Sequence, residues 1–489
     1  MLFTSPVFLF LFLPITFFGF LLARSLKHPA LVPVWLLAAS MIFYAWWSPI
    51  FLILLVGSTL VNWLCAHGIT GTQGARSKAI FIGGLVWNLG LLAYFKYTDF
   101  FISSFNAVSG AHVPLLHIIL PLGISFFTFQ KIAYLADIHA GHAKPGRLLD
   151  FALFVFFFPQ LIAGPIVHHA EVMPQFRAIA SGEKSESVTD AFAAGLTLLL
   201  IGLAKKIGVA DQVALLSTPV YEAAASGKTI GLILAWQAAL AYTVQLYFDF
   251  SGYSDMAIGL ARMFGVRMPA NFDSPYKATS IIDFWRRWHM TLSRFLRDYL
   301  YLPLGGNRLG PMRRYLNLMI VMLLGGLWHG AGWTYVVWGG LHGFFLMIAH
   351  VWRDRFGRAV PKVVGWGLTM LGVIIAWVYF RAPDMATANN ILGGMFGLHG
   401  VKSAIGLKEK AVTLLIPLAL IVAAALFPNS QEIMRLTKPV LSPVREPDTR
   451  LDSWLVWQPS TLTAFLGAAI LLGFLILSWK SSEFLYFQF

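Results

Sequence analysis

The sequence predicts an all-α polytopic membrane protein, and three observations point to this fold class. Of its 489 residues, 58% are hydrophobic and only 12% are charged, which is about half the charged share of a typical soluble domain. The mean hydropathy is +0.70. Continuous apolar runs of bilayer-spanning length recur from one end of the chain to the other. These runs predict ten or eleven transmembrane helices, with re-entrant or interfacial helices between them.

The first part of the chain alternates apolar runs with short polar loops. Arg24 and Lys27 follow the first run, and basic residues favour the cytoplasmic side, so the N-terminus is expected in the periplasm. Tryptophans and a proline at 46–49 break the second run into two spans. The spans expected here are 2–22, the two halves of 31–66, 79–95 and 114–135.

The next segment begins with an apolar stretch that is too short to cross a membrane. Residues 151–162 lead into a Gly-Pro pair, which is typical of a re-entrant or buried helix. Full spans are expected at 191–209 and 230–250. The second ends in polar and aromatic residues that indicate either a cavity lining or an ordinary interfacial loop. Asp249 and Asp255 in this stretch are candidate buried acids.

Residues 262–317 carry ten basic and only three acidic side chains, which predicts the main cytoplasmic face. Within them, 281–302 has helical periodicity with its charges on one side and is expected to lie in the interface or to dip into the protein. The net charge of +14 would indicate nucleic-acid binding in a soluble protein. In a membrane protein, basic loops that meet anionic lipids account for it, so no nucleic-acid partner is expected.

The stretch 313–350 is long enough to enter the membrane and return, and it contains His329 and His342. A histidine at membrane depth is costly and is a functional-site hypothesis by default. The alternative is a histidine that only bridges two helices. The remaining spans are expected at 362–380, 411–427 and 461–479. This arrangement places both termini in the periplasm.

The sequence gives little support for disulfide or metal chemistry. Cys65 is the only cysteine, so an intrachain disulfide and a thiolate metal cluster are excluded. His168 and His169 are adjacent, but no third ligand is evident. We therefore favour a structural role for them and predict no metal.

Two motifs carry a resemblance to a known family. The segment DFWRRWHMTLSRFLRDYLYLPLGGNR (283–308) is followed by LWHGAGWTYVVWGGLHG (327–343), and FFPQLIAGPIVHH (157–169) precedes both. Together they resemble the membrane-bound O-acyltransferase family. They are most similar to its bacterial cell-envelope branch, which contains alginate O-acetyltransferase membrane subunits and teichoic-acid D-alanylation proteins. The likeness extends over nearly the whole chain.

The resemblance implies a helical shell with a thin centre, between a cytoplasmic funnel for the acyl donor and a periplasmic funnel for the acceptor. It also implies that His329 is the essential histidine, that His289 is a second one lining the same tunnel, and that His342 occupies a third recurring position. The chemistry agrees, because a neutral imidazole can take a hydroxyl proton near neutral pH and burial keeps it neutral.

Donor and acceptor residues are expected on opposite faces. Arg286, Arg287, Arg294 and Arg297 suit a phosphate-bearing donor such as acetyl-CoA, although each can equally fix topology or bind lipid. Residues 481–489 form a tail after a single membrane domain, 1–480. Its ending FLYFQF resembles an FxYxxF acyl-relay motif in which Tyr486 accepts the acyl group. It also resembles a damaged protease-tag remnant (ENLYFQ), but the asparagine is absent.

The expected function is O-acetyl transfer in a bacterial inner membrane. Acetyl would pass from cytoplasmic acetyl-CoA to a periplasmic SGNH-hydrolase-like acetyltransferase that modifies alginate, an exopolysaccharide. The close alternative is the same chemistry on another glycan, such as cellulose or peptidoglycan. Two further alternatives are a secondary transporter with histidine proton relays and a lipid acyltransferase.

Overall fold

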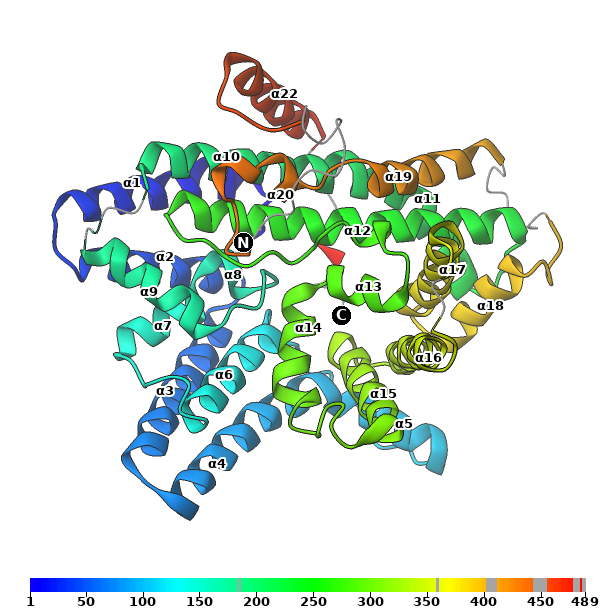
Figure 1. The fold of residues 1–489 in the computed structure, drawn as a ribbon, viewed down its shortest axis with the longest axis horizontal. Coiled ribbons are helices and arrows are strands. Elements are labelled where there is room, and N and C mark those ends of the chain that lie inside the picture. The colour runs from blue at the N-terminus through cyan, green and yellow to red at the C-terminus, as the bar shows by residue number, and fades with distance from the viewer. Residues whose placement is uncertain are drawn as a thin grey trace.

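A computed structural model describes residues 1–181, 183, 186–357, 360–401, 411–442, 455–477 and 484–485. These residues form helices, and within the described ranges there is no strand (Figure 1). The all-α prediction is therefore confirmed.

The chain forms α-helices, interrupted by short π- and 3₁₀-helical segments (η). In the first half these are η1 (Phe8–Phe12), α1 (Leu13–Ser25), α2 (Leu31–Ala45), α3 (Pro49–Gly71), α4 (Gly74–Leu92), η2 (Ala93–Tyr97), α5 (Thr98–Ser109), α6 (Ile124–His139), α7 (Leu148–Phe156), α8 (Phe158–Leu161), α9 (His169–Ser181), α10 (Val188–Leu203), η3 (Ala204–Ala210) and α11 (Asp211–Ala225). In the second half they are α12 (Leu232–Met263), η4 (Pro275–Lys277), α13 (Ile281–Arg287), α14 (Met290–Leu296), η5 (Arg297–Tyr301), α15 (Gly310–His329), α16 (Trp333–Phe356), α17 (Lys362–Arg381), α18 (Met385–Met395), η6 (Ala411–Leu414), α19 (Leu415–Leu426), α20 (Ser430–Ile433), η7 (Arg435–Thr437) and α22 (Thr461–Leu477).

Several of these helices can cross a membrane. By length and composition, six candidate spans lie in the described part of the chain: Phe8–Ser25, Pro49–Gly71, Gly74–Ser109, Val188–Ala225, Trp333–Phe356 and Lys362–Arg381. Shorter apolar helices cover Leu31–Ala45, Leu415–Leu426 and Thr461–Phe474. The protein is a membrane protein, as predicted. The expected count of ten or eleven spans stays a prediction, since it also includes shorter and interrupted runs.

The long helix α12 runs through the middle of the structure and is buried along most of its length (Figure 1). Helix α10 packs directly against it because glycines meet at the contact. A Cβ atom added at Gly202 would lie 2.5 Å from the carbonyl oxygen of Gly252, so the two backbones touch. Small residues permit this close approach between membrane helices.

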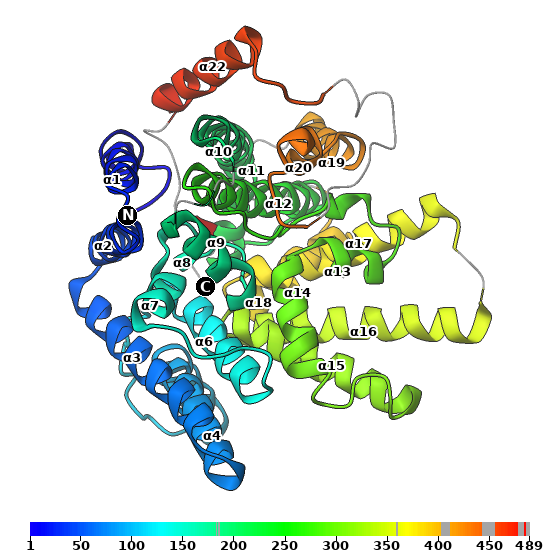
Figure 2. The same ribbon diagram turned by 60° about the vertical axis from the view of Figure 1, so that its left-hand side comes forward.

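Five helices around α12 position the candidate site. Helices α15 and α16 form a hairpin through a short turn at 330–332, and α17 packs against α16. Helices α13 and α14 lie near the centre of the molecule, on one side of α12 (Figure 1). By contrast, α22 lies at the outer edge, away from this centre (Figure 2).

Candidate active site

His289 lies at a break between α13 and α14. Its backbone has φ +44° and ψ +52°, the left-handed region that non-glycine residues rarely adopt. Such a conformation costs roughly 1–3 kcal/mol and tends to occur at functional sites. The side chain is 0% exposed. The break therefore places an imidazole in the protein interior, where a continuous helix was expected from the sequence.

Neighbouring polar groups assign the proton on the His289 ring. Nδ1 lies 3.0 Å from Oδ1 of Asn271. The Thr291 hydroxyl donates to the same oxygen over 2.9 Å, and it accepts the backbone N–H of Ile166 over 3.0 Å. Because Asn271 presents an acceptor, Nδ1 carries the hydrogen. Nε2, which has no hydrogen-bond partner among the described residues, presents its lone pair.

His329 is the last residue of α15 and is buried. Its ring packs edge-on against Trp338 and Phe380, with centroid distances of 5.1 and 5.2 Å. The ring of His289 lies 6.2 Å away, centroid to centroid. The structure thus brings together two of the three histidines that the resemblance singled out, although they come from different helices.

His342 lies in α16 and is also fully buried. The indole Nε1 of Trp285 donates to its Nδ1 over 3.3 Å. Trp338 contacts both His342 and His329, with ring centroids 4.9 and 5.1 Å away. His342 therefore belongs to the aromatic surroundings of the histidine pair.

A cavity of about 510 Å³ opens on the arginine-rich side of this pair. It is lined by Trp285, which bonds His342, and by Met290, which directly follows His289. The structure brings three of the four predicted arginines, Arg286, Arg294 and Arg297, to its wall. The fourth, Arg287, lines a neighbouring cavity of about 360 Å³.

The four arginines differ in whether they already form an ion pair with a carboxylate. Arg294 holds Glu171 through two hydrogen bonds of 2.5 and 2.9 Å. Arg287 and Arg297 pair with aspartates, at 2.9 and 2.6 Å respectively. Arg286 is exposed and forms no ion pair with any residue that the structure describes. It is therefore the most available cation in this cavity.

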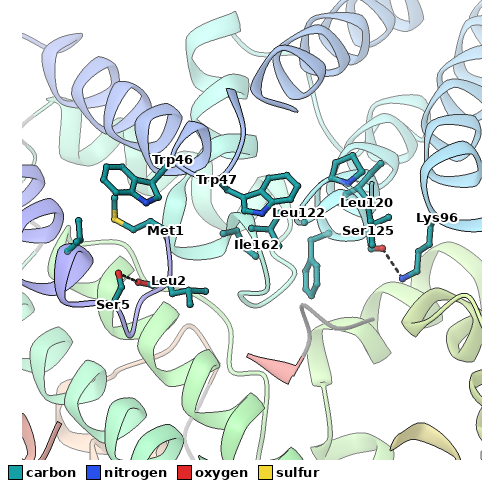
Figure 3. Close-up of a pocket in the computed structure, with 15 residues that line it drawn as sticks. Met1, Leu2, Ser5, Trp46, Trp47, Lys96, Leu120, Leu122, Ser125 and Ile162 are labelled. Atoms are coloured by element: carbon teal, nitrogen blue, oxygen red, sulfur yellow. Dashed lines mark hydrogen bonds between the residues drawn. The ribbon is translucent and has the colours of Figure 1, made fainter. Parts of the chain in front are cut away.

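A second cavity, of about 500 Å³, shares no lining residue with the first. Its wall includes Trp46, Trp47, Lys96 and Ser125 (Figure 3). The Lys96 ammonium donates to the backbone carbonyls of Trp328 and His329, over 2.5 and 3.1 Å. This cavity therefore borders the histidine pair through Lys96.

Lys96, Asn271 and Thr291 were not predicted from the sequence to belong to the site. Lys96 follows directly after an apolar run, and a lone lysine at that place was a signal that could have been used. Asn271 and Thr291 carry no comparable signal, because neither residue type is unusual near a membrane surface.

The candidate acids of α12 are buried in ion pairs. Asp249 lies 2.6 Å from the Lys206 ammonium, and Asp255 lies 2.6 Å from that of Lys205. Asp249 also accepts the backbone N–H of Leu485 over 3.1 Å. These pairs place charged groups inside the domain, and Asp249 also binds the segment 484–485.

The described C-terminal pair, drawn red near the centre of Figure 1, is buried against α12. The Phe484 ring stacks on Tyr253 at 4.3 Å and contacts Phe250 at 5.9 Å. Phe250 in turn contacts the ring of His289 at 4.8 Å. One aromatic ring therefore separates this segment from the histidine pair. The predicted relay residue Tyr486 lies outside the described residues.

The adjacent histidines 168 and 169 contact tyrosines of η5 and α6. Nδ1 of His168 is 3.2 Å from the Tyr299 hydroxyl, and the His169 ring packs beside Tyr134. Within the described ranges, no group of three His, Cys, Asp or Glu side chains could hold a metal ion. The structural role of these two histidines stays a prediction.

Comparison with known proteins identifies the family. Residues 140–389 match the model of MBOAT, the membrane-bound O-acyltransferase family. The chain is 46% identical over 434 residues to a peptidoglycan O-acetyltransferase of Helicobacter pylori, covering 82% of this chain and 81% of that protein. It is 45% identical over 407 residues to the "Probable alginate O-acetylase AlgI" of Pseudomonas aeruginosa, covering 81% and 75%.

A more distant relative is a teichoic acid D-alanyltransferase of Streptococcus thermophilus. It is 26% identical over 252 residues, which cover 48% of this chain and 58% of that protein. The resemblance seen in the sequence motifs is thereby confirmed. The chain belongs to the membrane-bound O-acyltransferase family and is an acyltransferase.

Proposed function

We propose that this protein moves acetyl groups from cytoplasmic acetyl-CoA across a bacterial inner membrane to a periplasmic partner that O-acetylates alginate. One observation carries the proposal: His289 and His329 lie together in the interior, and two cavities that share no lining residue come next to them, one at Met290, which follows His289, and one at Lys96, which bonds the His329 carbonyl. An acyl group can pass between two such cavities while its carrier stays on one side.

The arginine-lined cavity suits the donor. Acetyl-CoA carries phosphates, which guanidinium groups bind well. Arg286 has its charge available there, whereas Arg294 and Arg297 already pair with acids and shape the wall. The positive-inside rule places this basic face in the cytoplasm, where anionic lipids also meet it.

The histidine pair suits the transfer step. His329 removes the proton from an acceptor hydroxyl, whose oxygen attacks the thioester carbonyl. The new C–O bond forms, the C–S bond breaks, and the proton leaves with the CoA thiol. His289, with its proton held on Nδ1 by Asn271, presents Nε2 as a second acceptor at the same place. His342 supports the pair through Trp338.

The acceptor in this proposal is Tyr486 in the tail 481–489, which follows the membrane domain 1–480. A phenol is a weak nucleophile and needs a base. The burial of Phe484 and Leu485 beside Phe250 supports a tail that reaches toward the histidines. In this proposal both termini lie in the periplasm, where an SGNH-hydrolase-like acetyltransferase would take the acetyl group from Tyr486.

Peptidoglycan is the main alternative polymer. The Helicobacter pylori relative, which is named for that polymer, is 46% identical to this chain, and the alginate relative is 45% identical. These values do not separate the two. The transfer chemistry inside the membrane would be the same, because the partner selects the glycan.

The test uses purified protein in nanodiscs with acetyl-CoA labelled in the acetyl group. Wild type is expected to release CoA and to carry label, and both His329→Ala and Tyr486→Phe should abolish the label. His67→Ala is the control, because His67 is an exposed histidine on α3, away from the site. CoA release that survives in Tyr486→Phe would remove the relay but keep the enzyme. Absence of His329-dependent turnover would refute the proposal.

A further inference from the structure

The helix that runs from Gly74 to Ser109 changes its winding beside the histidine pair. It is α-helical in α4 and α5, but the five residues between them, Ala93–Tyr97, form a π-helical turn. The Thr98 hydroxyl donates to the carbonyl of Tyr94 over 2.8 Å within this irregular turn. Such bulges are often found at functional sites, because they re-aim side chains without ending the helix.

The π-turn presents two consecutive side chains to the end of α15. Lys96 donates to the carbonyl oxygens of Trp328 and His329, over 2.5 and 3.1 Å. The Tyr97 hydroxyl donates to the carbonyl of Leu327 over 2.9 Å. The last carbonyls of a helix have no partner within the helix. Here a neighbouring helix supplies donors to three of them in a row.

Binding the last carbonyls of α15 does not by itself explain why the residue at position 96 is a lysine. An ammonium inside a membrane protein is costly and usually marks function, whereas a neutral donor such as Tyr97 could satisfy a carbonyl at lower cost. The described partners of Lys96 are the two carbonyls and, at 3.4 Å, the Ser125 hydroxyl. None is a carboxylate. The cation instead lies against the negative end of the α15 helix dipole, at the residue that bears the imidazole.

We propose that Lys96 is a positioning residue for His329. By fixing the carbonyl of the last residue of α15, it fixes the direction in which the His329 side chain leaves the backbone toward His289. It also lines the 500 Å³ cavity. This inference rests on the proposed function, because it assigns to Lys96 a part in the same transfer step.

The chain offers a matched control in Lys131. Lys131 is fully buried, whereas Lys96 is partly exposed to the cavity. The Lys131 ammonium donates to the Ser58 hydroxyl over 3.0 Å and lies 4.4 Å from the centre of the Phe127 ring. Like Lys96, it has no carboxylate partner in the described structure. It differs in making no described contact with α15.

The experiment compares Lys96→Met, Lys96→Arg and Lys131→Met in nanodiscs, with CoA release from acetyl-CoA as the rate. Lys96→Met should lower kcat roughly 10- to 100-fold, because small displacements of a catalytic group are that costly. KM for acetyl-CoA should change by less than about twofold, since donor binding is untouched. Lys96→Arg should recover part of kcat. Lys131→Met should retain the wild-type kcat.

A second readout separates this inference from the proposed function. Diethyl pyrocarbonate modifies accessible imidazoles, and mass spectrometry gives its rate at His329 whether or not acetyl-CoA is the donor. Lys96→Met should change that rate and Lys131→Met should not. Equal labelling in the two variants would overturn the inference. So would a kcat of Lys96→Met that matches Lys131→Met, or an arginine variant no better than methionine. Wild type without turnover would refute the proposed function, while the labelling comparison would still decide the role of Lys96.

Discussion

The left-handed backbone at His289 leads to a prediction about the relative stability of glycine and alanine variants. At an ordinary helix position alanine is the more stable, whereas at position 289 glycine should be. His289→Gly and His289→Ala both remove the imidazole, its contact with Phe250 and its hydrogen bond to Asn271. The difference between the two variants therefore isolates the backbone. Both should lose acyl transfer, but the glycine variant should be the more stable of the two.

The magnitude follows from two opposing terms. A left-handed conformation costs a non-glycine residue roughly 1–2 kcal/mol, which glycine avoids. Glycine also makes the unfolded chain more flexible, which costs about 0.4–1 kcal/mol. The glycine variant should therefore exceed the alanine variant by about 0.5–1 kcal/mol in the free energy of unfolding.

The assay is unfolding by sodium dodecyl sulfate in mixed micelles, followed by tryptophan fluorescence. Ser103 is the control, because it is an exposed residue inside α5. There alanine should be the more stable variant by about 1 kcal/mol. If alanine also proves the more stable at position 289, the backbone at His289 is not left-handed and the account of the break between α13 and α14 is wrong.

Three further predictions concern the donor cavity, the helix packing and acid stability. Arg286→Ala should raise KM for acetyl-CoA about 3- to 10-fold with little change in kcat, because the lost phosphate contact is made equally in the ground and transition states. Gly202→Ala should lower stability by about 1–3 kcal/mol, since the new methyl group meets backbone, whereas Gly208→Ala, with open space around it, should not. Partial burial pushes the pKa of Glu186 up, but the hydrogen bond and charge of Arg262 outweigh it and hold the pKa below its usual range. A carboxyl with a lowered pKa stabilises the fold above its unfolded value, near 4.3, and loses that contribution as the pH falls. Glu186→Gln should therefore reduce the loss of stability on acidification from pH 5 to pH 3.

The outcomes that would contradict these predictions are distinct. A fall in kcat at unchanged KM in Arg286→Ala would mean that this arginine acts in the transition state and not in donor binding. Equal stability of Gly202→Ala and Gly208→Ala would show that α10 can move away from α12 at low cost. An unaltered acid response in Glu186→Gln, in the same unfolding assay, would show that this carboxyl contributes little to acid sensitivity.

Hydropathy and motifs were enough to predict much of the site. The apolar run 313–350 does form a helical hairpin, α15 and α16, and it carries His329 and His342 inside. Three of the four candidate arginines do meet at one cavity. Both results follow from local signals: a bilayer-length run must bury its polar residues, and a basic amphipathic segment turns its charges to one side.

The local breaks could not be predicted, because tertiary contacts set them. The stretch 281–302 has unbroken helical periodicity, yet it divides at His289, where the N–H of Met290 bonds the Asn271 carbonyl over 2.9 Å. The expected span 114–135 is not one helix either, because α6 begins only after Gly123, at φ +74°. Lys96 was missed because a single lysine hardly changes the average hydropathy around it.

The two cavities that share no lining residue bear on the energetics of the proposed reaction. Each turnover sends an acyl group outward and returns the proton of the acceptor hydroxyl inward, where it ends on the CoA thiol. The outward transfer is formally that of an acylium cation, with one positive charge. The proton carries one positive charge inward, so the exchange moves no net charge across the membrane. Its equilibrium is then independent of both membrane voltage and the transmembrane pH gradient. The thioester alone would drive acetylation outside the cell membrane, even in de-energised cells.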